Sequence, residues 1–151
     1  MLNRFCKTAC QGAALAAALG AGVANADVSI SGGWLRAVPP VSPTMAGYLT
    51  VTNNGDTSVK ITGARSDIAG HTMLHSMKTL DDGTRKMGHM HHIMLAPGDS
   101  FSLTPGGDHL MLMKLQRVPQ LGESVTVCLL QAEGDALCSA LPVRSEAPEE
   151  S

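Results

Sequence analysis

The sequence is poor in aromatic residues and has no excess of basic ones. Two Phe, one Trp and one Tyr are the aromatic residues among 151. Lys and Arg number 11 against 13 Asp and Glu, which gives a net charge of −2 with neutral His. Nucleic-acid binding needs a basic patch, so this composition argues against a nucleic acid as partner.

Long apolar runs are scarce as well, and the clearest one lies near the N-terminus. Arg4 and Lys7 precede an apolar stretch over residues 13–23, and Ala24-Asn25-Ala26 follows it. This order is typical of a secretory signal peptide, and the stretch is shorter than the roughly 20 residues that span a bilayer. We therefore expect export, cleavage after Ala26 and no stable membrane insertion of the mature chain.

Cysteine is also rare once residues 1–26 are set aside. Cys128 and Cys138 then remain, and no Cys directly follows the cleavage site, so a lipid anchor is not expected. A three-residue loop at 132–134 would place the two Cys opposite each other, and an oxidising compartment favours a disulfide. Two inert thiols or a Cys-based copper site are the alternatives.

The rest of the chain has a β pattern. Short β-branched and apolar runs alternate with Gly, Pro, Asn and Asp, and no sustained helical periodicity occurs. We expect one all-β domain over residues 27–144, an antiparallel sandwich or barrel, and a disordered acidic tail over residues 145–151. The predicted strands span residues 28–38, 47–53, 58–64, 71–79, 84–95, 100–103, 109–115, 123–131 and 136–143.

Met and His are what the chain has in abundance, and they are clustered. Of nine Met, seven lie between Met73 and Met113, and all six His lie between His71 and His109. Residues two apart in a strand share a face, so His109 and Met111 would present an imidazole beside a thioether. Taken alone, this tripeptide is more simply a Met-rich strand that begins with one polar residue.

A predicted hairpin around residues 81–83 carries most of the other His and Met residues. Its first arm places His or Met at positions 71, 73, 75 and 77, which share one face. Such a face suits neither a hydrophobic core nor solvent, and it is a plausible row of ligands. His75 and Met87 would lie on facing arms, although the sequence leaves the register of the hairpin open.

The chemistry of these side chains favours copper(I). Thioethers are soft ligands and imidazoles are intermediate, a mixture that selects copper(I) over calcium and magnesium and, less decisively, zinc. A blue-copper electron carrier would need a Cys thiolate beside two His. We therefore predict a copper(I) site formed by His75, Met87, His109 and Met111.

The second arm of the hairpin has further candidate ligands. His89, Met90 and His91 are candidates for a second, weaker site that would take copper(II). The alternative is that these residues, with His92, are solvent-exposed on an edge strand.

The spacing of the four ligands resembles that of the periplasmic copper chaperones of the PCuAC type. That family has a His, a Met twelve positions later and, after twenty-one further residues, His-x-Met, which matches His75, Met87, His109 and Met111. Ser76 departs from the family, whose members often carry Met there. Further similar segments are Trp34-Leu35-Arg36-Ala37, residues 46–53 and residues 105–112.

The resemblance implies a cupredoxin-like Greek-key fold and a periplasmic monomer. It also implies delivery of copper for cytochrome oxidase assembly, to an oxidase subunit or to a thiol-bearing assembly protein. Copper buffering or resistance without a dedicated acceptor is the alternative. No catalytic triad, Cys-His pair or paired carboxylate stands out, so we do not expect an enzyme.

Overall fold

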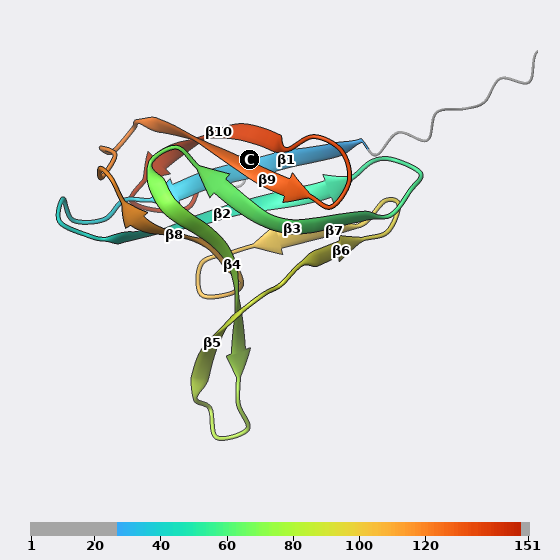
Figure 1. The fold of residues 1–151 in the computed structure, drawn as a ribbon. Helices are drawn as coiled ribbons and strands as arrows, with labels where there is room; N and C mark the ends of the chain where they lie inside the picture. The colour runs from blue at the N-terminus through green and yellow to red at the C-terminus, as the bar shows by residue number, and fades with distance from the viewer. Residues whose placement is uncertain (1–26, 149–151) are drawn as a thin grey trace, which may run out of the picture.

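The computed structural model describes residues 27–148, and over this range it consists of strands and contains no helix (Figure 1). No helix in this range is therefore long and apolar enough to cross a membrane. The predicted signal peptide and the last residues of the predicted tail lie outside the described residues. The strands are β1 (Val28–Arg36), β2 (Thr44–Asn53), β3 (Val59–Ser66), β4 (Ala69–Thr79), β5 (Arg85–His89), β6 (Ile93–Leu95), β7 (Ser100–Leu103), β8 (His109–Leu115), β9 (Ser124–Gln131) and β10 (Leu137–Arg144).

Strands β4, β8, β2, β1, β10, β9 and β3 pair in this order and form a barrel, which closes where β3 pairs with β4 through Ala64 and Thr72. The predicted all-β domain is thereby confirmed. One pairing departs from the predicted antiparallel arrangement: β1 and β10 run parallel, with Leu35 opposite Val143. The remaining strands extend the sheet, with β5 beside β4, β6 beside β3 and β7 beside β2.

Alternation along β4 and β8 separates the core from an outer face. Leu74, Leu110 and Leu112 are at most 1% exposed and belong to the hydrophobic core of the barrel. Because successive side chains of a strand point to opposite faces, the His and Met residues between these leucines lie on the outer face of the barrel wall.

The predicted strand over residues 84–95 is interrupted. The Met90 amide donates to the Leu74 carbonyl at 2.9 Å, and Met90 itself packs against the core. The chain then leaves β4 and pairs with β3, so that Ile93 lies opposite Ile61. Two shorter strands, β5 and β6, therefore replace the single predicted one.

The β4–β5 hairpin projects away from the barrel (Figure 1). Every residue of β5 is exposed, and the hairpin turn contains Gly83 at φ +82°, a conformation that glycine adopts without strain. The Asp108 carboxylate accepts a 2.9 Å hydrogen bond from the Met77 amide. This bond ties the hairpin to the turn that precedes β8.

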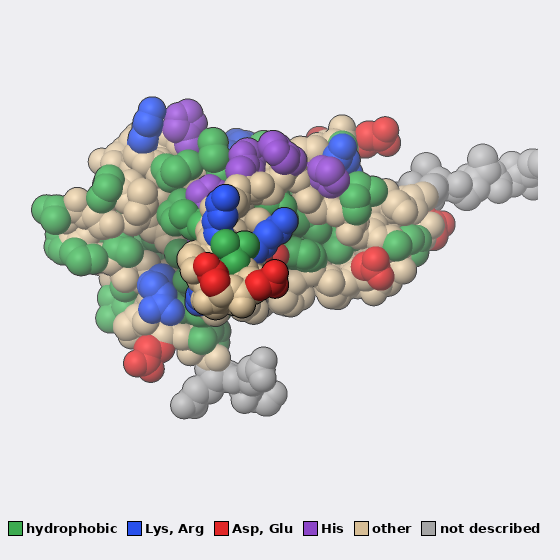
Figure 2. Space-filling view, turned by 90° about the horizontal axis from the view of Figure 1, so that it is seen from below, with side chains coloured by type: hydrophobic (Ala, Val, Ile, Leu, Met, Phe, Trp, Pro, Cys, Tyr) green, Lys and Arg blue, Asp and Glu red, His purple; other side chains and the backbone are tan. Residues whose placement is uncertain are grey.

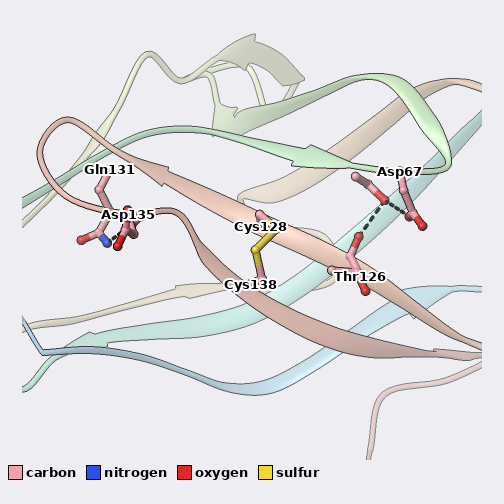
Figure 3. The surroundings of a disulfide bond; sticks show 7 residues. Asp67, Thr126, Cys128, Gln131, Asp135 and Cys138 are labelled. Carbon is pink, nitrogen blue, oxygen red and sulfur yellow. Dashed lines mark hydrogen bonds between the residues drawn. A yellow bond between two sulfur atoms is a disulfide. The ribbon is translucent and has the colours of Figure 1, made fainter.

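Strands β9 and β10 are joined by a disulfide between Cys128 and Cys138 (Figure 3). The two residues are direct partners in the strand register, with Cα atoms 3.9 Å apart. This is the pairing that the three-residue loop predicted, and it leaves neither sulfur as a thiolate ligand for a metal.

Candidate metal centre

The strand register places His75 at the middle of a row of three imidazoles. His75 lies opposite His109 across β4 and β8, and opposite His89 across β4 and β5. The ring centroid of His75 is 5.7 Å from that of His109 and 6.4 Å from that of His89. Two of the four predicted ligands therefore lie side by side, although they are 34 positions apart in the chain.

Thioethers flank this row on both sides. Met73 lies opposite Met111, and Met77 lies opposite Met87. Cross-strand partners point to the same face of a sheet, so over positions 71–77 of β4 and their partners on β5 and β8 one outer face presents only His and Met. Figure 2, seen from the hairpin end, shows His side chains gathered along one side of the molecule. The residues of this His/Met face are His71, Met73, His75, Met77, Met87, His89, His109, Met111 and Met113.

All four predicted ligands thus lie on the His/Met face, but they are not all neighbours of one another. Met111 and Met87 occupy diagonal positions on opposite sides of His75, since their direct partners are Met73 and Met77. The structure therefore does not bring Met87 and Met111 next to each other. Met87 is 48% exposed on the outer strand, and rotation of its side chain would be needed for all four to reach one ion.

Met73 and Met77 are residues that the predicted ligand set omits. They neighbour His75 on its own strand and face, and both are half-buried. The alternation of His and Met along positions 71–77 was the sequence signal for them. Either thioether lies within the same patch as the predicted set, and both are therefore candidate additional ligands.

His109 is held in one tautomer by the backbone. Its Nδ1 lies 2.9 Å from the Gly107 carbonyl oxygen, and the side chain is only 9% exposed. A carbonyl oxygen can only accept a hydrogen bond, so Nδ1 carries the hydrogen and Nε2 keeps its lone pair. A metal-ligating His is normally fixed in this way through its other nitrogen.

His75, unlike His109, has no hydrogen bond within residues 27–148 that orients its ring. Its Nδ1 is buried and has no hydrogen-bond partner in the described structure. Burial, followed by the neighbouring His109 and His89, lowers the pKa of His75 below its ordinary value. The neutral imidazole that results is the form that binds metal ions, and a bound ion would satisfy the unpaired nitrogen. The residues present therefore fit a metal ion.

The mixed imidazole and thioether set is a candidate metal site. Within residues 27–148, no three His, Cys, Asp or Glu side chains form a group that could hold a metal. With Cys128 and Cys138 paired in the disulfide, the candidate ligands on the His/Met face are neutral, and this combination suits copper(I).

Solved structures share this fold. The solution structure of apo-DR1885 from Deinococcus radiodurans is 29% identical, covers 97% of each chain and superposes with a TM-score of 0.62. The structure of CuI-DR1885 is 35% identical over 76% of each chain, with a TM-score of 0.56. A copper-bound PCuAC domain from PmoF2 is 19% identical, with a TM-score of 0.64 over 82% of this chain and 97% of that domain. The protein therefore has the cupredoxin-like fold of PCuAC domains, as the sequence resemblance predicted.

The family itself is shown by the sequence. The chain belongs to the LpqE-like family, whose model, described as "Putative lipoprotein LpqE-like", matches residues 28–143. A curated relative, "Putative lipoprotein Lxx21020" from Leifsonia xyli subsp. xyli, is 28% identical over 117 residues, which are 78% of this chain and 69% of the relative.

Proposed function

We propose that the protein binds copper(I) through His75, Met87, His109 and Met111 and carries it in the periplasm for cytochrome oxidase assembly. The observation that carries this proposal is the pairing of His75 with His109. One imidazole is fixed with its Nε2 free, and the other has a buried nitrogen without a partner.

The identity of the metal is supported by the ligands and by a relative. Imidazole accepts several transition metals, whereas thioether ligands favour the softer copper(I). DR1885 has been solved in a CuI form, and that chain is 35% identical to this one over 76% of each chain. A set of neutral ligands leaves the bound ion with its charge of +1, which is tolerable on an outer face that water reaches.

The position of the site suits transfer of the ion. Met87 lies on an exposed edge strand of the projecting hairpin, where an acceptor could reach the metal. Thioethers and imidazoles hold copper(I) less tightly than thiolates do. We therefore propose that a monomer hands copper(I) to a thiol-bearing assembly protein or to an oxidase subunit.

Titration with copper(I) against a competing chelator tests the site. We expect His75→Ala and Met111→Ala each to weaken binding about tenfold or more, since even residues that only support a ligand contribute 10–100-fold. Met94→Ala is the matched control, because Met94 is a 55% exposed thioether on β6, away from the His/Met face. Unchanged copper(I) affinity in both ligand variants would show that these residues do not form the site.

Deletion of the gene at limiting copper separates delivery from buffering. Loss of oxidase activity that added copper restores would support delivery for assembly. Sensitivity to excess copper with normal oxidase activity would support buffering, the alternative with the same ligands.

The form of the exported protein is a separate question, because the family description contains the word lipoprotein. We propose cleavage after Ala26 and a mature chain that begins at Asp27 without a lipid, since Asp27 offers no thiol for acylation. Intact-mass spectrometry of the exported protein checks this. A mass that includes acyl chains would contradict it.

A further inference from the structure

A second group of imidazoles continues outward from the candidate copper(I) site. The rings of His89 and His91 stack with centroids 4.7 Å apart and planes 27° apart, and both residues are exposed. His89 is also 6.4 Å from His75, which is 5.7 Å from His109. Four imidazoles therefore run in series from the buried His109 to the surface.

The break between β5 and β6 creates this stack. Met90 points inward, packs against the core and donates its amide to the Leu74 carbonyl. His89 and His91, on either side of Met90, are consequently presented together at the surface. Met90 is thereby removed from the predicted secondary set of His89, Met90 and His91, and the outer pair consists of imidazoles alone.

We propose that His89 and His91 form a second metal site, which takes copper(II). Imidazoles without a thioether suit the divalent rather than the monovalent ion, and copper(II) binds nitrogen ligands more tightly than the other divalent first-row metals. Both rings are exposed, so water would fill the remaining coordination positions. With two protein ligands, this site binds more weakly and exchanges faster than the copper(I) site. Because the two rings are stacked, one or both would have to turn about the side-chain bonds to direct one nitrogen from each toward a common ion.

This site is independent of the proposed copper(I) function, and the experiment keeps the two apart. Silver(I), a soft ion that does not change oxidation state under these conditions, is first used to fill the thioether site of the purified protein. Copper(II) is then titrated and followed by electron paramagnetic resonance, in which coordinated nitrogen gives a characteristic splitting. We expect one equivalent of copper(II) to bind with nitrogen ligands.

Three variants decide the assignment. We expect His91→Ala to weaken copper(II) binding about tenfold or more while it keeps silver(I) and copper(I) binding, because His91 lies outside the His/Met face. His92→Ala is the control, because His92 is an exposed neighbour that takes part in none of the ring contacts found among the described residues. We expect it to bind copper(II) as the wild type does. His75→Ala should weaken copper(I) binding and leave copper(II) binding unchanged.

Several outcomes would overturn the second site. His91→Ala could bind copper(II) as tightly as the wild type, or His92→Ala could lose as much affinity as His91→Ala. Tighter binding of zinc(II) than of copper(II) at the same two residues would overturn the choice of metal. His91 and His92 are exposed and His75 is half-buried on the outer face, so circular dichroism should show an unchanged β fold in every variant.

Discussion

Gly107 and Asp108 each accept one hydrogen bond from a residue of the His/Met face. The Gly107 carbonyl orients the His109 ring through Nδ1, and the Asp108 carboxylate holds the Met77 amide of β4. The second bond joins residues 31 positions apart and anchors the hairpin against the start of β8. The His109 imidazole and the strand that carries His75 are therefore positioned before any metal arrives.

Asp108→Ala should loosen this anchor. A hydrogen bond to a charged group contributes roughly 1.5–3 kcal/mol, so we expect faster hydrogen exchange at the Met77 amide and a weaker hold on copper(I). Asp108→Asn keeps an acceptor oxygen and should retain most of the protection. Exchange followed by nuclear magnetic resonance gives the readout, and equal rates at Met77 in wild type and Asp108→Ala would contradict the anchoring role.

At the scale of the strands, the sequence was most informative where turn residues bracket a short run. β7 and β8 begin and end where they were predicted. Pro, Gly and Asp residues directly precede both strands and determine where each one begins. The strand predicted over 84–95 was wrong as a single element, since alternation does not reveal a change of partner from β4 to β3.

The candidate site was predictable only in part for the same reason. Alternation showed that His109 and Met111 share a face, because this is a property of one strand. The pairing of His75 with His109 is a contact between strands distant in sequence, and local pattern does not determine it. The sequence therefore predicted which residues are candidates but not that Met87 and Met111 lie on opposite sides of His75.

The β4–β5 hairpin should change its dynamics when copper(I) binds. All residues of β5 are exposed and this strand has a neighbour on one side only, so its amides should exchange early in the apo protein. Coordination by Met87 would hold β5 against β4 and slow this exchange. Hydrogen exchange with mass spectrometry measures it, with β9 as an internal reference that should not change. Equal protection of β5 with and without copper(I) would argue against Met87 as a ligand.

The disulfide should stabilise the fold without affecting copper(I) binding. It closes a loop of sequence separation 10, and the loss of such a cross-link costs roughly 3 kcal/mol of unfolding free energy in the chain-entropy model. In the barrel, β1 and β2 separate β10 from β8, and β3 separates β9 from β4. Cys128→Ala/Cys138→Ala should therefore melt at a lower temperature yet bind copper(I) normally. A parallel loss of copper(I) affinity would show that the two features are coupled.

At the scale of the whole molecule, the barrel and the candidate site are built on opposite faces of the same strands. Copper(I) that binds the folded state alone should raise the free energy of unfolding by about 2.7 kcal/mol at a free concentration one hundred times Kd. Thermal unfolding followed by the fluorescence of Trp34, which is 2% exposed, gives the readout. His75→Ala should show a smaller shift in melting temperature with copper(I) than the wild type, and a full shift in that variant would place the ion elsewhere.

The shared use of β8 has a consequence for how this chain can change over generations. Leu110 and Leu112 fill the barrel while His109, Met111 and Met113 stand outside it. The insertion or deletion of one residue within the strand would exchange these two sets, sending thioethers inward and leucines into water. A lineage that loses or gains a codon here would lose the fold and the ligands together. Insertions and deletions should therefore be confined to the loops.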